Sequence, residues 1–118
     1  MTHVLVVEDD EQILNLLLEL LDEEGYAVTG AANGRAALQV LETSHPDLII
    51  TDIMMPEMDG IALCSHIHTD PSIAGIPIIV CSAGSNKPLL ENCSYTAFLP
   101  KPFAISAVVD AVESVLTV

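Results

Sequence analysis

Short apolar runs alternate along the chain with longer segments in which apolar residues recur at helical spacing. The runs are rich in Val, Ile and Leu and end at Gly, Pro, Asn or Asp, a pattern typical of strands buried on both faces of a sheet. They predict strands at residues 3–7, 26–31, 47–52, 76–81 and 96–99. Helical periodicity predicts helices at residues 11–24, 34–44, 60–69 and 104–116, and more weakly at 86–93. This alternation indicates an α/β fold, a doubly wound five-stranded parallel sheet with flanking helices, formed by one domain over residues 1–118.

The first predicted helix is unusually apolar. Its hydrophobic residues cover an arc of about 200° at 100° per residue, wider than one core-facing stripe needs; they are Ile13, Leu14, Leu16, Leu17, Leu18, Leu20 and Leu21. Deep burial with one or two exposed leucines explains this arc, and we prefer that interpretation. A face that docks a partner is the alternative.

Composition and charge limit the classes of partner and the compartment that we expect. Of the 118 residues 51% are hydrophobic but only 3% aromatic, which predicts an aliphatic core. The net charge is −14, and the basic residues are Arg35, Lys87 and Lys101 alone. We therefore expect no direct binding to nucleic acid and no attachment to an anionic membrane. The sequence has no membrane-spanning stretch and no signal pattern, so we expect a cytoplasmic protein. Its three cysteines are Cys64, Cys81 and Cys93 and lack Cys-x-x-Cys spacing. We expect them to be reduced and mostly buried.

Residues whose side chains can bind a metal or take part in a reaction lie where the predicted strands end. Glu8 and Asp9 follow the first strand and Asp52 the third, while Ser82 follows the fourth and Lys101 the fifth. Parallel strands bring their carboxyl ends to one edge, where open α/β sheets bind ligands. Three neighbouring carboxylates would repel one another, and Mg²⁺ prefers such a site. A carboxylate, a metal, a lysine and a hydroxyl are the parts needed to accept a phosphoryl group in line.

Four motifs resemble the receiver domain of bacterial two-component response regulators, in order and over the whole chain. They are Val-Val-Glu-Asp-Asp at 6–10, Asp-Leu-Ile-Ile-Thr-Asp-Ile-Met-Met-Pro-Glu-Met-Asp-Gly at 47–60, Val-Cys-Ser-Ala at 80–83 and Leu-Pro-Lys-Pro-Phe at 99–103. The resemblance implies a flavodoxin-like fold and a signalling module of a phosphorelay rather than an enzyme. It implies a histidine kinase or histidine phosphotransfer protein as phosphoryl donor, a downstream protein target and the option of a homodimer.

The same resemblance implies roles for individual residues. Asp52 would be the phosphoacceptor, and Lys101 would contact the phosphoryl group. The peptide bond between Lys101 and Pro102 would be cis. Mg²⁺ would be held by Glu8, Asp9, Asp52 and the backbone carbonyl of Met54. Ser82 would be the switch hydroxyl and Phe98 the switch aromatic, although Phe98 serving only as a core residue is equally well supported. We expect Asp10 to cap the first helix rather than bind metal.

The chain also departs from the family pattern. From Ser82 to Lys101 it advances 19 positions, fewer than is usual, and Pro88 lies within this stretch. We therefore expect the helix there to be short or shifted, and any dimer that relies on it to be altered. Ala104 stands where Ser or Asp would cap the last helix.

Three other functions remain to be weighed against the phosphoacceptor. A pseudo-receiver would keep the fold and bind proteins without phosphorylation, which the intact acidic, hydroxyl and lysine set argues against. A phosphohydrolase of the haloacid dehalogenase type would need an aspartate where Met54 stands, and a cap domain. A flavodoxin-like cofactor binder lacks an aromatic, glycine-rich phosphate cradle.

Overall fold

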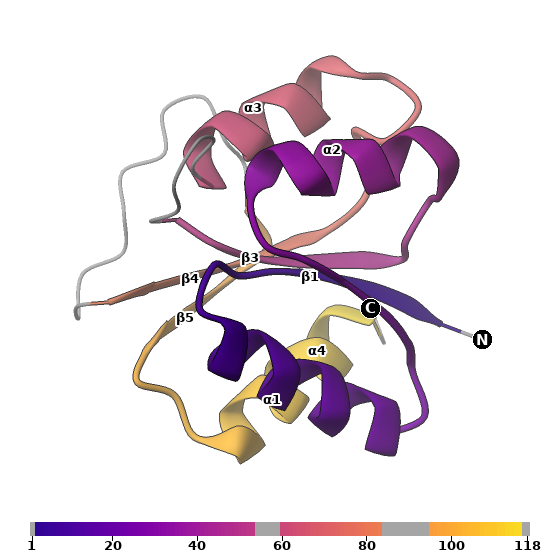
Figure 1. Cartoon of the computed structure of the whole chain (residues 1–118). Helices are drawn as coiled ribbons and strands as arrows, with labels where there is room; N and C mark the ends of the chain where they lie inside the picture. The colour runs from indigo at the N-terminus through magenta and orange to yellow at the C-terminus, as the bar shows by residue number, and fades with distance from the viewer. Residues whose placement is uncertain (1, 54–59, 84–94, 117–118) are drawn as a thin grey trace.

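The computed structural model describes residues 2–53, 60–83 and 95–116, and its centre is a parallel sheet in the order β2-β1-β3-β4-β5 (Figure 1). The strands are β1 (His3–Val7), β2 (Ala27–Ala31), β3 (Leu48–Asp52), β4 (Ile78–Ala83) and β5 (Ala97–Lys101). The predicted doubly wound sheet is thus confirmed. From β1 the chain passes to β2 on one side and then to β3, β4 and β5 on the other. The strand order therefore reverses between β1 and β3, where such sheets form their ligand sites.

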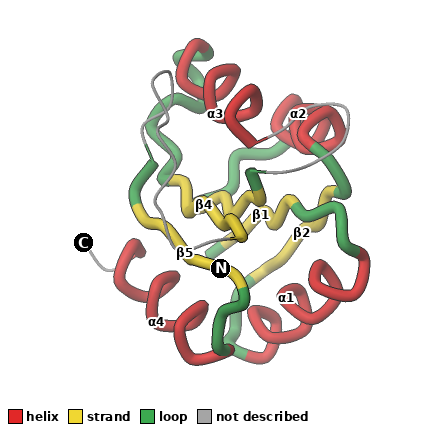
Figure 2. The backbone as a smooth tube through the Cα atoms, turned by 90° about the vertical axis from the view of Figure 1, so that its left-hand side faces the viewer, coloured by secondary structure: helices red, strands yellow, loops and turns green. Residues whose placement is uncertain are grey.

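Helices cover both faces of this sheet (Figure 2). Helices α1 (Glu11–Glu23) and α4 (Ile105–Leu116) lie on one face, and α2 (Gly34–Thr43) and α3 (Gly60–Thr69) lie on the other. The inner strands β1 and β3 are therefore buried on both faces, which explains why their sequences are continuous apolar runs.

Successive side chains of β3 point alternately into the two halves of the core. Leu48 and Ile50 belong to the cluster that includes the buried face of α1 and α4, whereas Ile49 belongs to the cluster of α2 and α3. Every residue of β3 is buried, including Thr51 and Asp52 at its carboxyl end. A strand held so firmly on both faces fixes the position of its last carboxylate.

The helix ends follow local sequence signals. The Asp10 side chain accepts hydrogen bonds from the backbone N–H groups of Gln12 and Ile13, at 2.9 and 3.2 Å, which confirms its predicted role as an N-cap. Gly25 follows α1 with φ of 96°, a conformation that glycine adopts without strain. Helix α4 begins at Ile105 directly after Ala104, whose methyl side chain offers no capping oxygen.

The last two strands lie later in the sequence than predicted. β4 starts at Ile78 because Ile76 donates its N–H to Ile73 in a turn, and Pro77 has no N–H to give. The ladder then continues to the pairs Ser82–Pro100 and Ala83–Lys101. Ser82 and Lys101 are therefore held inside the ends of strands rather than in the loops after them.

Other expectations have different outcomes. The predicted helix at 86–93 lies outside the described residues. Within them, no helix is long and apolar enough to cross a membrane.

Cys81 is a free buried thiol, as expected, but Cys64 is disulfide-bonded, so the expectation of reduced thiols is wrong for that residue. A disulfide needs two cysteines with a suitable Cα distance and suitable Cβ directions, and motif spacing along the chain does not reveal these.

Gly60 makes the close contact that joins α3 to the end of β3. Its N–H donates to the Ile53 carbonyl at 2.9 Å, and a Cβ at this position would lie 2.3 Å from the Asp52 carbonyl oxygen. That neighbour is backbone and cannot turn aside. No residue larger than glycine fits here without moving the carboxyl end of β3.

We predict that Gly60→Ala lowers the free energy of unfolding by about 1–3 kcal/mol, the usual result of overpacking. Urea unfolding measures this directly. Gly75→Ala is the matched control, because a Cβ there meets nothing within 4 Å and its effect should stay within about 1 kcal/mol. Equal unfolding midpoints for the two variants would contradict the steric argument.

Candidate functional site

Four charged side chains meet at the carboxyl edge of the sheet. Asp52 ends the central strand β3, and Glu8 and Asp9 follow the neighbouring strand β1. Lys101 ends β5, two strands away from Asp52, or about 10 Å at ordinary strand spacing. The fold therefore brings together residues that are up to 93 positions apart in the sequence.

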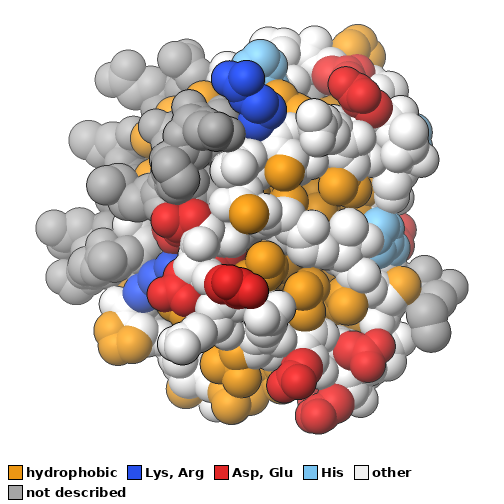
Figure 3. All heavy atoms as spheres, in the orientation of Figure 1, with side chains coloured by type: hydrophobic (Ala, Val, Ile, Leu, Met, Phe, Trp, Pro, Cys, Tyr) orange, Lys and Arg blue, Asp and Glu red, His pale blue; other side chains and the backbone are white. Residues whose placement is uncertain are grey.

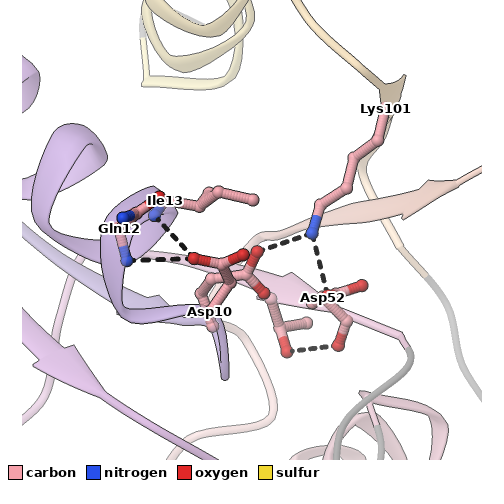
Figure 4. Close-up of polar contacts among 7 residues, drawn as sticks. Asp10, Gln12, Ile13, Asp52 and Lys101 are labelled. Atoms are coloured by element: carbon pink, nitrogen blue, oxygen red, sulfur yellow. Dashed lines mark hydrogen bonds and ion pairs between the residues drawn. The ribbon is translucent and has the colours of Figure 1, made fainter.

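Lys101 bridges the two buried carboxylates. Its Nζ donates to Glu8 Oε1 at 2.5 Å and to Asp52 Oδ2 at 2.9 Å (Figure 4). The Lys101 side chain is 19% exposed, whereas those of Glu8 and Asp52 are 3% and 9% exposed. Charge-assisted bonds in such a weakly hydrated place are stronger than the same bonds at a surface. One ammonium group therefore compensates two carboxyl groups, and the cluster remains acidic.

Glu8 is the most deeply buried side chain of this cluster. Its N–H donates to the Ala31 carbonyl at 3.0 Å, which ties the residue to the end of β2. Burial raises the pKa of its carboxyl group from the usual 4.5 to about 7, the neighbouring Asp52 carboxyl adds to the rise, and Lys101 offsets part of it. Its Oε2 is buried and accepts no hydrogen bond. A buried carboxylate oxygen in this condition favours the approach of a cation.

Asp9 completes an acidic group that can hold a metal ion. Glu8, Asp9 and Asp52 each offer a carboxylate oxygen, and these atoms lie within 4.8 Å of one another. Asp9 is exposed, so the group opens to solvent on its side. The neighbouring Asp10 is turned toward the first turn of α1 (Figure 4), which leaves it out of the group.

The other predicted site residues lie in different surroundings. Ser82 is half-buried near the end of β4, one position after the register partner of Asp52. Phe98 is half-buried and packs against the core cluster of α2 and α3. The Lys101–Pro102 bond is cis, as the resemblance implied. Met54 lies outside the described residues.

Three residues at the site were not predicted from sequence. Gly60 packs on the Asp52 carbonyl, and only the Asp-Gly pair at a helix start hinted at it. Cys81 pairs in register with Asp52 and, with Phe103, lines the small cavity beneath the carboxyl groups. Burial raises the pKa of the Cys81 thiol to about 12, and the side chain packs in the core cluster of α1 and α4.

Comparisons with known proteins agree with this geometry. The family model for the response regulator receiver domain matches residues 4–113. The transcriptional regulatory protein PdtaR of Mycobacterium tuberculosis is 41% identical over 94% of this chain, which covers 55% of PdtaR. The chain thus spans about half the length of that relative. The chemotaxis protein CheY of Halobacterium salinarum is 38% identical, with 98% of this chain and 97% of CheY covered.

A solved structure gives the same result. The response regulator protein TrrA from Thermotoga maritima, in complex with Mg(2+)-BeF, superimposes with a TM-score of 0.86 and 31% identity, covering 98% of this chain and 99% of TrrA. The sheet order, the acidic cluster with its lysine and the family match over residues 4–113 lead to one conclusion: this chain belongs to the response regulator receiver domain family, the phosphoacceptor signalling modules of two-component systems.

Proposed function

We propose that Asp52 is the residue that accepts the phosphoryl group, from a histidine kinase or a histidine phosphotransfer protein. The observation that carries this proposal is the convergence of Glu8, Asp9 and Lys101 on Asp52 at the carboxyl edge of the sheet. Asp52 is held at the end of a strand that is buried on both faces. Its carboxylate therefore has a fixed position, which in-line phosphoryl transfer requires.

In the proposed transfer a carboxylate oxygen of Asp52 attacks the phosphorus atom. A P–O bond forms, the P–N bond to the donor imidazole breaks, and its electron pair returns to the ring nitrogen. Lys101 moves part of its pairing from Asp52 to a phosphoryl oxygen, since the aspartyl phosphate brings additional negative charge. The chain itself thus acts mainly by positioning and by charge compensation.

We further propose Mg²⁺ as the resident ion, held by Glu8, Asp9, Asp52 and the backbone carbonyl of Met54. The hard oxygen donors and the uncompensated Glu8 Oε2 fit this ion. That TrrA was solved with Mg(2+)-BeF supports the choice. When bound, the ion neutralises charge on the carboxylates and on the phosphoryl oxygens.

The output proposed for this module is a change of protein partner in the cytoplasm. The Ser82 hydroxyl would turn toward the phosphoryl group, and Phe98 would leave the half-buried position it has against the α2–α3 core. Such a local change of charge biases a surface between two states, and a downstream protein reads the difference. Residues 1–118 would act as one receiver domain, without turnover of a separate substrate and without direct contact to nucleic acid.

We predict that incubation with a small phosphodonor and Mg²⁺ adds one phosphoryl mass to the intact protein, and that Asp52→Asn abolishes this gain. Mass spectrometry of the intact chain measures it. Asp110→Asn, an exposed aspartate of α4, is the control and should be phosphorylated normally. A gain that persists in Asp52→Asn, or that does not require Mg²⁺, would contradict the assignment.

The raised pKa of Glu8 predicts a pH-dependent stability in Mg²⁺-free buffer. A carboxyl group whose folded pKa of about 7 exceeds its usual 4.5 is protonated more readily in the folded state. Its favourable contribution is therefore complete below pH 4.5 and is lost as the pH rises through 7, by about 3 kcal/mol at most. Glu8→Gln should lack this loss, so that it gains on wild type between pH 5 and pH 8.

Urea unfolding at each pH, in the presence of a chelator, tests this expectation. Glu19→Gln removes an exposed glutamate and should keep the pH profile of wild type. Saturating Mg²⁺ should stabilise wild type increasingly as the pH rises, because it binds the ionised carboxylate. Parallel profiles for wild type and Glu8→Gln would show that Glu8 is not the group responsible.

A further inference from the structure

Thr51 is the one buried polar side chain of the described residues that has no part in the proposed transfer. The buried polar or charged residues there are Glu8, Thr51 and Asp52. The acidic cluster reaches the surface: Figure 3 shows acidic side chains beside a basic one at the left of the molecule, the side toward which the strands of Figure 1 run. Thr51 is 0% exposed and directly precedes Asp52 in the sequence. A polar group this deep in an aliphatic core needs a physical explanation.

The surroundings of Thr51 are those of a valine. Its register partners are Val7 on β1 and Val80 on β4, and both are buried. Because side chains alternate along a strand, Thr51 lies on the same face of β3 as Ile49, in the α2–α3 half of the core. Threonine and valine have nearly the same shape, but burying a hydroxyl group costs free energy that burying a methyl group does not. Packing therefore gives no reason for the hydroxyl group.

The hydroxyl group of Thr51 holds one end of a peptide unit. It donates a hydrogen bond to the Asp52 carbonyl oxygen at 3.0 Å. The Ile53 N–H, at the other end of the same peptide unit, donates to the Cys81 carbonyl at 3.0 Å. Gly60 packs against this unit so closely that a Cβ there would collide with the Asp52 carbonyl oxygen and the Ile53 Cα. Rotation of the peptide unit would therefore break two hydrogen bonds or bring it into α3.

The position of this peptide unit matters for the chemistry of Asp52. The Cα atom that carries the reactive carboxylate directly precedes it, and about 1 Å of misplacement can cost about a hundredfold in rate. The carbonyl oxygen also bears partial negative charge, and Thr51 binds it from the α2–α3 face. By alternation the Asp52 side chain belongs to the opposite face, with Leu48 and Ile50. The hydroxyl group thus keeps the negative end of this dipole away from a cluster that is already acidic.

We propose that Thr51 is a positioning residue for phosphoryl transfer: its buried hydroxyl group fixes the peptide unit after Asp52 and, with it, the direction of the attacking carboxylate. The effect on the transfer rate rests on the proposed function of Asp52. The restraint on the peptide unit does not, and it is measured separately below. Thr51 itself touches neither the donor nor the phosphoryl group.

Two substitutions separate the hydroxyl group from the methyl group. Thr51→Val keeps the shape and removes the donor, so its urea midpoint should equal or exceed that of wild type. Its initial rate of phosphorylation by a small phosphodonor, at saturating Mg²⁺, should fall at least about threefold. Thr51→Ser keeps the donor and loses a buried methyl group, so its midpoint should fall while its rate stays within about twofold of wild type.

Thr29→Val is the matched control for these rates. Thr29 is a half-buried threonine of β2, its register partner Leu5 belongs to the α2–α3 half of the core, and its hydroxyl group bonds to His3. Removing that hydroxyl group should leave the rate of phosphorylation within about twofold of wild type.

Amide hydrogen exchange, followed by NMR, tests the restraint without any phosphoryl transfer. The Ile53 N–H reports on the peptide unit that Thr51 holds. The Ile49 N–H, which donates to the Pro77 carbonyl at 3.0 Å, is the reference on the same strand. In Thr51→Val, exchange at Ile53 should become at least about threefold faster relative to Ile49, and Thr51→Ser should keep the wild-type ratio.

Different results would overturn different parts of this inference. Rates that follow the urea midpoints, with Thr51→Ser slower than Thr51→Val, would make Thr51 a residue of the core only. An unchanged ratio of Ile53 to Ile49 exchange in Thr51→Val would overturn the inference whatever the rates of phosphorylation. A wild type that gains no phosphoryl group on Asp52 would remove the proposed function, and the exchange ratio would then decide by itself whether Thr51 fixes this peptide unit.

Discussion

The structure depends on one electrostatic constraint: two buried carboxyl groups, Glu8 and Asp52, share the ammonium group of Lys101. Buried charges are tolerated only with partners, and two carboxyl groups with one lysine remain under-compensated. The raised pKa of Glu8 and its unbonded Oε2 are two signs of the same deficit. In the proposed function a cation and, later, a phosphoryl group with its own demand for positive charge would both act on this deficit. Phosphoryl transfer and signalling would then have a common physical origin in it.

The buried strands of the sheet hold that cluster in place. β3 is buried along its whole length, and β1 beside it is buried from Val4 onward, so neither strand end can move far. The cluster lies where strand order reverses, and Lys101 reaches it from a strand on the other side of β4. Gly60 then brings α3 against the Asp52 backbone. In the proposed transfer, this rigid sheet edge would keep the carboxylates fixed while the long, flexible side chain of Lys101 changes partners.

Much of this arrangement could be predicted from sequence. The apolar runs of β1 and β3 gave both strands, because burial on two faces leaves a continuous pattern, and the acids that end them mark the sheet edge. The ends of β4 and β5 were misplaced, since Pro77 delays one strand and ladder pairing extends both past their apolar runs. Cys81 at the site looked like core from sequence, which it also is. Leu16 is the exposed leucine of the wide apolar arc of α1, at 48%. Periodicity along one helix could not single it out, because exposure depends on what the rest of the fold packs against that helix.

The most direct test of the account is the unfolding free energy of Lys101→Met at pH 8, measured without and with saturating Mg²⁺. Removing the lysine leaves Glu8 and Asp52 buried without their shared partner and should cost about 3–5 kcal/mol in chelator. If the deficit of positive charge is the central constraint, Mg²⁺ should restore most of this loss, and stabilise the variant more than wild type. A loss that Mg²⁺ does not reduce, or no loss at all, would contradict the account.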